Sequence, residues 1–151
     1  MAEVLSLQMT KVAANPEVKL QPSERNGRSR IMFGQVASIA AAIADTIYFG
    51  RIPAGARITG AWLNNAAGTA SSTLALSLRK SSDKTVISGT ITAAAAISSA
   101  QKVDGLTGTL TNAGQSYIKP YEVDVVGTIA GAATPASPGQ LISVIVDYVI
   151  D

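Results

Sequence analysis

The segment TLALSLRK, residues 73–80, alternates strictly between leucine and less apolar side chains. In an extended chain, Leu74, Leu76 and Leu78 point to one side, and the residues between them point to the other. This two-residue period predicts a strand that is buried on one face. A strand of this kind needs a second layer of structure to cover its leucines.

Short strand patterns recur from residue 29 onward, and residues typical of turns separate them. Glycine, serine, threonine and asparagine are frequent in these separators, and the pattern of a long helix is missing. Many short strands predict an all-β fold, and we expect a jelly-roll-like β-sandwich of about eight strands. In addition to 73–80, the predicted strands cover residues 29–39, 45–52, 57–65, 85–91, 122–131 and 140–150.

The faces of three predicted strands follow from the same alternation. Ile47 and Phe49 should share one face of their strand, with Ile52 on the other. Ile58 and Trp62 should share a face of the next strand. The strand 140–150 is apolar on both faces, so we expect it to be central and nearly buried on both sides.

Two alanine-rich stretches, residues 37–45 and 92–101, have good helix propensity instead. The first is interpreted either as a short helix or as the end of a strand followed by a loop. The second is predicted to form one or two helical turns that cross between the sheets.

The first 28 residues differ from the rest of the chain. The segment VLSLQMT alternates apolar and polar residues, and a polar stretch with helix- and strand-breaking residues follows it. We predict an extended N-terminal arm, 1–28, that pairs with a partner, followed by a β-sandwich domain, 29–151; a disordered leader is the alternative. Leu5, Leu7 and Met9 form the apolar side of the arm, and Pro16, Pro22 and Gly27 are its breakers.

The chain contains no cysteine and no histidine. Disulfides, thiolate catalysis, Cys or His zinc sites and Ser-His-Asp chemistry are therefore excluded. Among the ten carboxylates, Glu122 and Asp124 form a pair on one strand face, about 7 Å apart, which is typical of a solvated face rather than of a glycosidase cleft. We expect no enzyme activity, no catalytic or metal-binding residues and no cofactor.

The charge of the chain is small, with a formal net charge of +2. Its basic residues are scattered except for Arg25, Arg28 and Arg30, and no aromatic residue is interleaved with these three, so we expect no nucleic-acid partner. The first residues do not have the pattern of a signal peptide. A long uncharged segment lies further along the chain, at residues 125–146, but glycines and prolines interrupt it. We expect no membrane segment and synthesis in the cytoplasm.

The segment YFGRIPAGARITGAWL, residues 48–63, predicts a turn between two strands. Pro53 fixes φ for a turn position and Gly55 permits a positive φ. Arg51 and Arg57 flank the turn and would lie near each other in a hairpin, facing either water or an acidic partner. The segment lacks the spacing of a phosphate-binding loop.

The stretch from Asp45 to Lys80 resembles a segment that recurs in small structural proteins of tailed bacteriophages. An apolar strand leads into a G-x-I-P-x-G-A-x-I turn, and a strand, a loop of small residues and S-T-L-x-L-x-L follow. The chain resembles the head decoration or cement proteins of podophage-like capsids in this stretch. The matching residues are Gly50, Ile52, Pro53, Gly55, Ala56, Ile58, Gly60, Trp62, Ser72, Thr73, Leu74, Leu76 and Leu78.

This resemblance implies a jelly-roll fold, homotrimers, and binding to the outer surface of the major capsid protein without catalysis. The expected function is to stabilise a phage capsid from outside by bridging its subunits, on the exterior of the virion. A tail, fibre or baseplate β-module, or a carbohydrate-binding jelly roll, is the alternative. The candidate contact residues are Leu5, Leu7, Met9, Arg25, Arg28, Arg30, Arg51 and Arg57.

Overall fold

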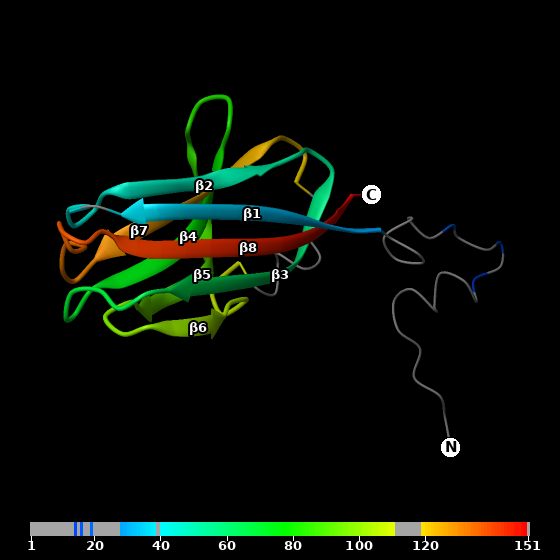
Figure 1. Ribbon diagram of the computed structural model, residues 1–151. Coiled ribbons are helices and arrows are strands. Elements are labelled where there is room, and N and C mark those ends of the chain that lie inside the picture. The colour runs from blue at the N-terminus through cyan, green and yellow to red at the C-terminus, as the bar shows by residue number, and fades with distance from the viewer. Residues whose placement is uncertain are drawn as a thin grey trace, which may run out of the picture.

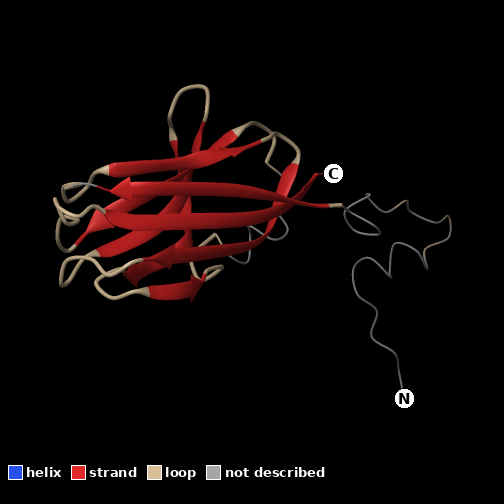
Figure 2. Ribbon diagram, in the orientation of Figure 1, coloured by secondary structure: helices blue, strands red, loops and turns tan. Residues whose placement is uncertain are grey.

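The computed structural model describes residues 28–38, 40–110 and 119–150, together with the single positions 14, 16 and 19. These residues form eight strands in two four-stranded antiparallel sheets that pack face to face (Figures 1 and 2). The predicted arm, 1–28, lies almost wholly outside the described residues, so it stays a prediction. No helix in the described part of the chain is long and apolar enough to cross a membrane.

The order of the strands makes the sandwich a jelly roll. The first sheet has the order β1-β8-β3-β6 and the second has the order β2-β7-β4-β5, so the chain crosses repeatedly between the layers. This confirms the predicted fold class. The strands are β1 (Ser29–Ser38), β2 (Thr46–Ile52), β3 (Ala56–Asn65), β4 (Thr73–Lys80), β5 (Val86–Ala96), β6 (Gln101–Asp104), β7 (Val123–Ala130) and β8 (Gln140–Ile150).

The core lies between the two sheets and follows the predicted alternation. Leu74, Leu76 and Leu78 on β4 are fully buried, as the period of two predicted. Strand β8 is central, between β1 and β3, and its inner face is buried. Its outer face is partly exposed, with Leu141 48% exposed, so the prediction of burial on both sides is wrong for that face.

Two β-bulges overturn the predicted faces of β2 and β3. The pairing of β2 with β7 shifts between Tyr48 and Gly50, and Ile52 is therefore buried on the same side as Ile47 and Phe49. The pairing of β3 with β8 shifts between Ile58 and Gly60. Each extra residue switches the side to which the following residues point.

As a result of the second bulge, Trp62 lies on the outer face, while Ile58 remains buried in the core. A β-carbon on Gly60 would lie only 3.1 Å from the indole ring of Trp62, so this glycine leaves room for the ring to lie along the strand.

The alanine-rich stretches are not helical. Residues 92–96 continue β5, and after a short loop residues 101–104 form β6, so the predicted crossing helix is wrong. Alanine favours helices only weakly, and cross-strand pairing of Ala95 with Leu74 outweighs that preference here. The first stretch is the end of β1 followed by a loop, which was one of its two interpretations.

The turn at Pro53 to Gly55 is not a hairpin. Its two strands belong to different sheets, because β2 pairs with β7 while β3 pairs with β8 and β6. Gly55 does have a positive φ of 80°, and its amide donates to the carbonyl of Lys119 at 2.7 Å. The turn therefore carries the chain from one layer of the sandwich to the other.

Candidate functional site

The outer face of the second sheet holds a fully buried carboxylate, Asp124 on β7. The pairing register places Arg51 of β2 on one side of it and Arg79 of β4 on the other. The Nε atoms of these arginines lie 3.1 and 3.3 Å from the two carboxylate oxygens. Glu122, which is half-exposed, lies 3.6 Å from Arg51. The predicted solvated face is therefore correct for Glu122 and wrong for Asp124.

The turn between β4 and β5 completes this ionic cluster, which we define as Arg51, Arg79, Ser81, Lys84 and Asp124. The ammonium group of Lys84 donates to Asp124 at 2.8 Å, and the hydroxyl of Ser81 donates to it at 2.7 Å. Burial alone would raise the pKa of Asp124, but these hydrogen bonds and the one from Arg51, with the charge of Lys84, outweigh burial and hold the pKa well below its ordinary value. The ionic cluster thus fastens the β4–β5 turn to the sheet.

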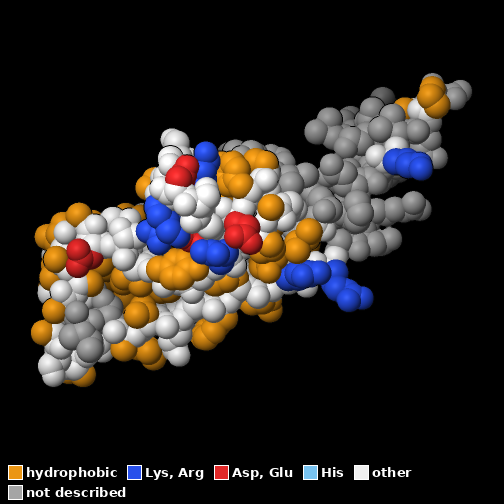
Figure 3. Space-filling view, turned by 90° about the horizontal axis from the view of Figure 1, so that it is seen from above, with side chains coloured by type: hydrophobic (Ala, Val, Ile, Leu, Met, Phe, Trp, Pro, Cys, Tyr) orange, Lys and Arg blue, Asp and Glu red, His pale blue; other side chains and the backbone are white. Residues whose placement is uncertain are grey.

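An open depression of about 340 Å³ adjoins the ionic cluster. Lys80 lies over the ring of Tyr121 at 4.9 Å, and Arg79 lies over the ring of Tyr48 at 5.7 Å. Figure 3 shows basic and acidic side chains intermixed over this part of the surface, with hydrophobic side chains beside them. The depression is lined by Arg51, Ser81, Ser82, Tyr121 and Glu122.

The described candidate arginines lie at one end of the sandwich, although the sequence scatters them. Ser29 of β1 and Arg57 of β3 both pair with Val149 of β8. The start of β1 therefore lies at the same end of the sheet as Arg57. Arg28 and Arg30 are exposed beside Ser29. Arg51 follows on the other sheet, across the Pro53 turn. Leu5, Leu7, Met9 and Arg25 lie outside the described residues.

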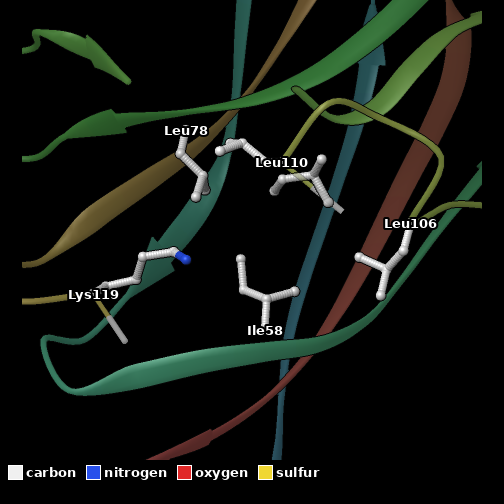
Figure 4. A pocket seen from close by; sticks show the side chains of 6 residues that line it. Ile58, Leu78, Leu106, Leu110 and Lys119 are labelled. Carbon is white, nitrogen blue, oxygen red and sulfur yellow. The ribbon is translucent and has the colours of Figure 1, made fainter. Parts of the chain in front are cut away.

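A second feature at this end is a buried lysine between the sheets. Lys119 is only 1% exposed and points into a cavity of about 10 Å³, which is about the size of one water molecule (Figure 4). Burial, together with the charge of Arg57, lowers the pKa of Lys119 to about 8. The cavity is too small for a ligand, so we treat Lys119 as a structural residue. The other residues that line the cavity are Ile58, Leu78, Ile91, Leu106 and Leu110.

The lowered pKa makes stability depend on pH in a defined direction. The folded protein releases the proton of Lys119 near pH 8, whereas the unfolded chain holds it to about pH 10.5. Since the unfolded chain binds more protons between these values, the free energy of unfolding should rise with pH there, by about 2–3 kcal/mol relative to Lys119→Met. Urea unfolding of both proteins from pH 7 to 10.5 measures this difference. Lys102→Met, at an exposed lysine, is the control, and an equal pH dependence in all three proteins would contradict the prediction.

The outer face of the first sheet carries several exposed apolar side chains, which were not predicted from the sequence. Ile31 and Phe33 on β1 are 67% and 60% exposed, and Leu141 on β8 lies on the same face. Ile145 on β8 pairs with Phe33 on one side and with Trp62 of β3 on the other, and both Ile145 and Trp62 are partly exposed. Lys102 of β6 lies over the ring of Trp62 at 5.9 Å. The signal was present in SRIMFGQVAS, where both faces of the strand carry apolar residues. We call Ile31, Phe33, Trp62, Leu141 and Ile145 the apolar face.

Within the described ranges, the structure has no group of three or more acidic residues that could hold a metal ion. No protein-family model matches the sequence, and no curated protein is significantly similar to it.

Solved structures, in contrast, contain chains of similar fold. A chain from the structure titled "Capsid of Ralstonia phage GP4" superposes with a TM-score of 0.62 at 19% identity, covering 83% of this chain and 86% of that one. What the two chains share is the fold. A chain of the cyanophage Pam1 capsid asymmetric unit gives 0.49 at 20% identity, with coverage of 83% and 86%. A chain of the capsid of Helicobacter pylori bacteriophage KHP30 gives 0.43 at 14% identity, covering 81% and 87%.

Proposed function

We propose that this protein is a structural component of a phage virion that binds the outside of the capsid and bridges subunits of the major capsid protein as a homotrimer. The observation that carries the proposal is the jelly-roll fold shared with a chain of the Ralstonia phage GP4 capsid along 83% of this chain. The resemblance of residues 45–80 to phage decoration proteins points the same way, since these residues form β2, the crossing turn, β3 and β4.

The physical basis of the function is the addition of contacts across the seams of a shell. A shell that holds packaged DNA fails where neighbouring subunits separate, and a bridging trimer adds buried area at such places. Contacts that are weak singly act together through their high effective concentration. This role needs no catalytic residue, and the protein is proposed to act without catalysis.

Arg28 and Arg30 support an acidic contact surface on the capsid protein, whereas Arg51 already pairs with Asp124 and Glu122 of this chain. Arg28 and Arg30 are exposed at the start of β1, at the same end of the sandwich as Arg51 and Arg57. Exposed cations of this kind favour an acidic partner and make the binding sensitive to salt. The predicted arm, residues 1–28, precedes this end and is proposed to extend across a subunit boundary.

Removal of residues 1–25 tests the function and the arm together. We expect the truncated protein to keep its fold, because β1 begins at Ser29, and to lose at least about 10-fold in affinity for empty capsids of its phage. Co-sedimentation at 50 and 300 mM salt measures the affinity, and heat-induced DNA release measures particle stability. If the full-length protein does not bind capsids at either salt concentration, the proposed function is wrong; if truncation changes neither result, only the arm is wrong.

Carbohydrate binding is the second candidate function, and the open depression beside Tyr121 favours it. Serine, glutamate and arginine side chains beside an aromatic ring are groups that can bind sugar hydroxyls. The rings of Tyr121 and Tyr48, however, already have cations of this chain over them. Specific binding to a glycan array, without binding to capsids, would favour this candidate.

A further inference from the structure

Four residues of the apolar face, Ile31, Phe33, Ile145 and Trp62, lie at neighbouring positions across three strands. Phe33 on β1 pairs in register with Ile145 on β8, and Ile145 pairs with Trp62 on β3. Figure 1 shows β1, β8 and β3 side by side in this layer. Three large apolar side chains therefore form a row, with Ile31 beside Phe33 on β1. The polar row of Gln35, Ser143 and Asn64 separates Leu141 from it.

A solvated sheet would carry polar residues at these positions. Outward-facing residues of a sandwich are normally polar, and contiguous exposed apolar side chains mark interaction surfaces. The outer face of the second sheet has the usual composition over its centre, where Ser77 of β4 pairs with Thr90 of β5. Tyr48 on β2 and Val86 on β5 are also exposed, but these two strands are not neighbours in the second sheet. Only the first sheet therefore has exposed apolar side chains at paired positions of adjacent strands.

The charges around the apolar face indicate what covers it. Two cations and two carboxylates lie on this side of the sheet: Arg57 on β3, Lys102 and Asp104 on β6, and Asp147 on β8. The net charge of these four side chains is zero, so a strongly acidic or strongly basic partner would leave the charges of one sign uncompensated. A second copy of this chain brings the same apolar row and the same balanced set of charges.

We propose that copies of this chain associate with one another through the apolar face. Strand β1 is at the edge of its sheet, so Ile31 and Phe33 lie at a margin that other copies can approach. Around a three-fold axis, the same margin of three copies can meet. The inference deepens the proposed function by assigning the surface that holds the trimer together, and it rests on that function only for the number of copies.

Phe33→Asp tests the inference at a position where folding should tolerate the change. Phe33 is 60% exposed, so the melting temperature should change little. We expect the midpoint concentration for dissociation of the oligomer to rise at least about 30-fold. Analytical ultracentrifugation over a range of protein concentrations measures it. Val86→Asp is the matched control, because Val86 is 66% exposed on β5 of the other sheet, and it should leave the oligomer unchanged.

Each alternative result overturns the inference in a recognisable way. If the unaltered protein is a monomer up to high concentration, or if Phe33→Asp dissociates no more readily than Val86→Asp, copies do not meet at this face. If Phe33→Asp keeps its oligomeric state but loses capsid binding, the capsid protein covers the face, and the inference fails while the proposed function stands. If the oligomer dissociates as expected but no form binds capsids, the inference stands and the proposed function fails.

Discussion

Replacing Asp124 with asparagine is expected to lower the free energy of unfolding by about 3 kcal/mol. The asparagine has nearly the same shape, but it leaves the positive charges of Arg51, Arg79 and Lys84 without the carboxylate that lies within 3.3 Å of each. Breaking a buried ion pair can cost more than this. The cost should be smaller here, because about half of the Arg51 side chain and half of the Lys84 side chain are exposed to water. Urea unfolding at pH 7 measures the loss.

The control for this change is Glu122→Gln. Glu122 also contacts Arg51, but its side chain is 56% exposed, so its loss should cost less than about 1 kcal/mol. Because the folded pKa of Asp124 is lowered, its contribution is present above the ordinary pKa of 3.8 and is lost only as the pH falls towards the lower folded pKa. The difference between the original protein and Asp124→Asn should therefore be constant from pH 8 to about 5 and shrink in stronger acid. Equal losses for the two variants would show that burial of the carboxylate is unimportant.

Replacing Gly34 with alanine is expected to cost about 3 kcal/mol, or to prevent folding. A β-carbon at Gly34 would lie 2.2 Å from the carbonyl oxygen of Phe49 and 2.8 Å from its carbonyl carbon. These are backbone atoms of β2, which the pairing with β7 holds in place. Thermal and urea unfolding measure the loss.

Gly50→Ala is the matched control on the neighbouring strand. A β-carbon at Gly50 would lie 2.5 Å from the sulfur of Met32, which is near the end of a flexible side chain and can move. Both changes restrict the unfolded chain equally, so this effect cancels between them. We expect Gly50→Ala to cost about 1 kcal/mol or less. If Gly34→Ala costs no more than Gly50→Ala, β2 can move away from β1 and the prediction is wrong.

The regular strands could be predicted from the sequence because their signal is local. Leu74, Leu76 and Leu78 are buried as the alternation requires, and the many short strands led to the correct sandwich. The bulges in β2 and β3 could not be predicted in this way. Each adds one residue whose neighbours still look alternating, so the faces of Ile52 and Trp62 were reversed.

The ionic cluster and the row of arginines were missed because they depend on pairing between distant segments. Asp124 is 73 positions from Arg51 and 45 from Arg79, and only the register of three strands brings them together. The turn at Pro53 had correct local chemistry, with a positive φ at Gly55. The turn was predicted to join a hairpin, but it joins strands of different sheets. In a two-layer sandwich, two strands that a short turn connects need not pair with each other.

The pairing of β1 with β8 has a consequence for how this protein is made. Ser29 pairs with Val149, so the two strands that complete the first sheet are separated by nearly the whole domain. During synthesis on a ribosome, β1 cannot pair until β8 has left the exit tunnel. Until then, Ile31, Met32 and Phe33 of β1 stay exposed. Sheets that depend on such distant pairings form slowly, and their unpaired strands are prone to aggregation. Each newly made chain therefore exposes this apolar strand until β8 is available to pair with it.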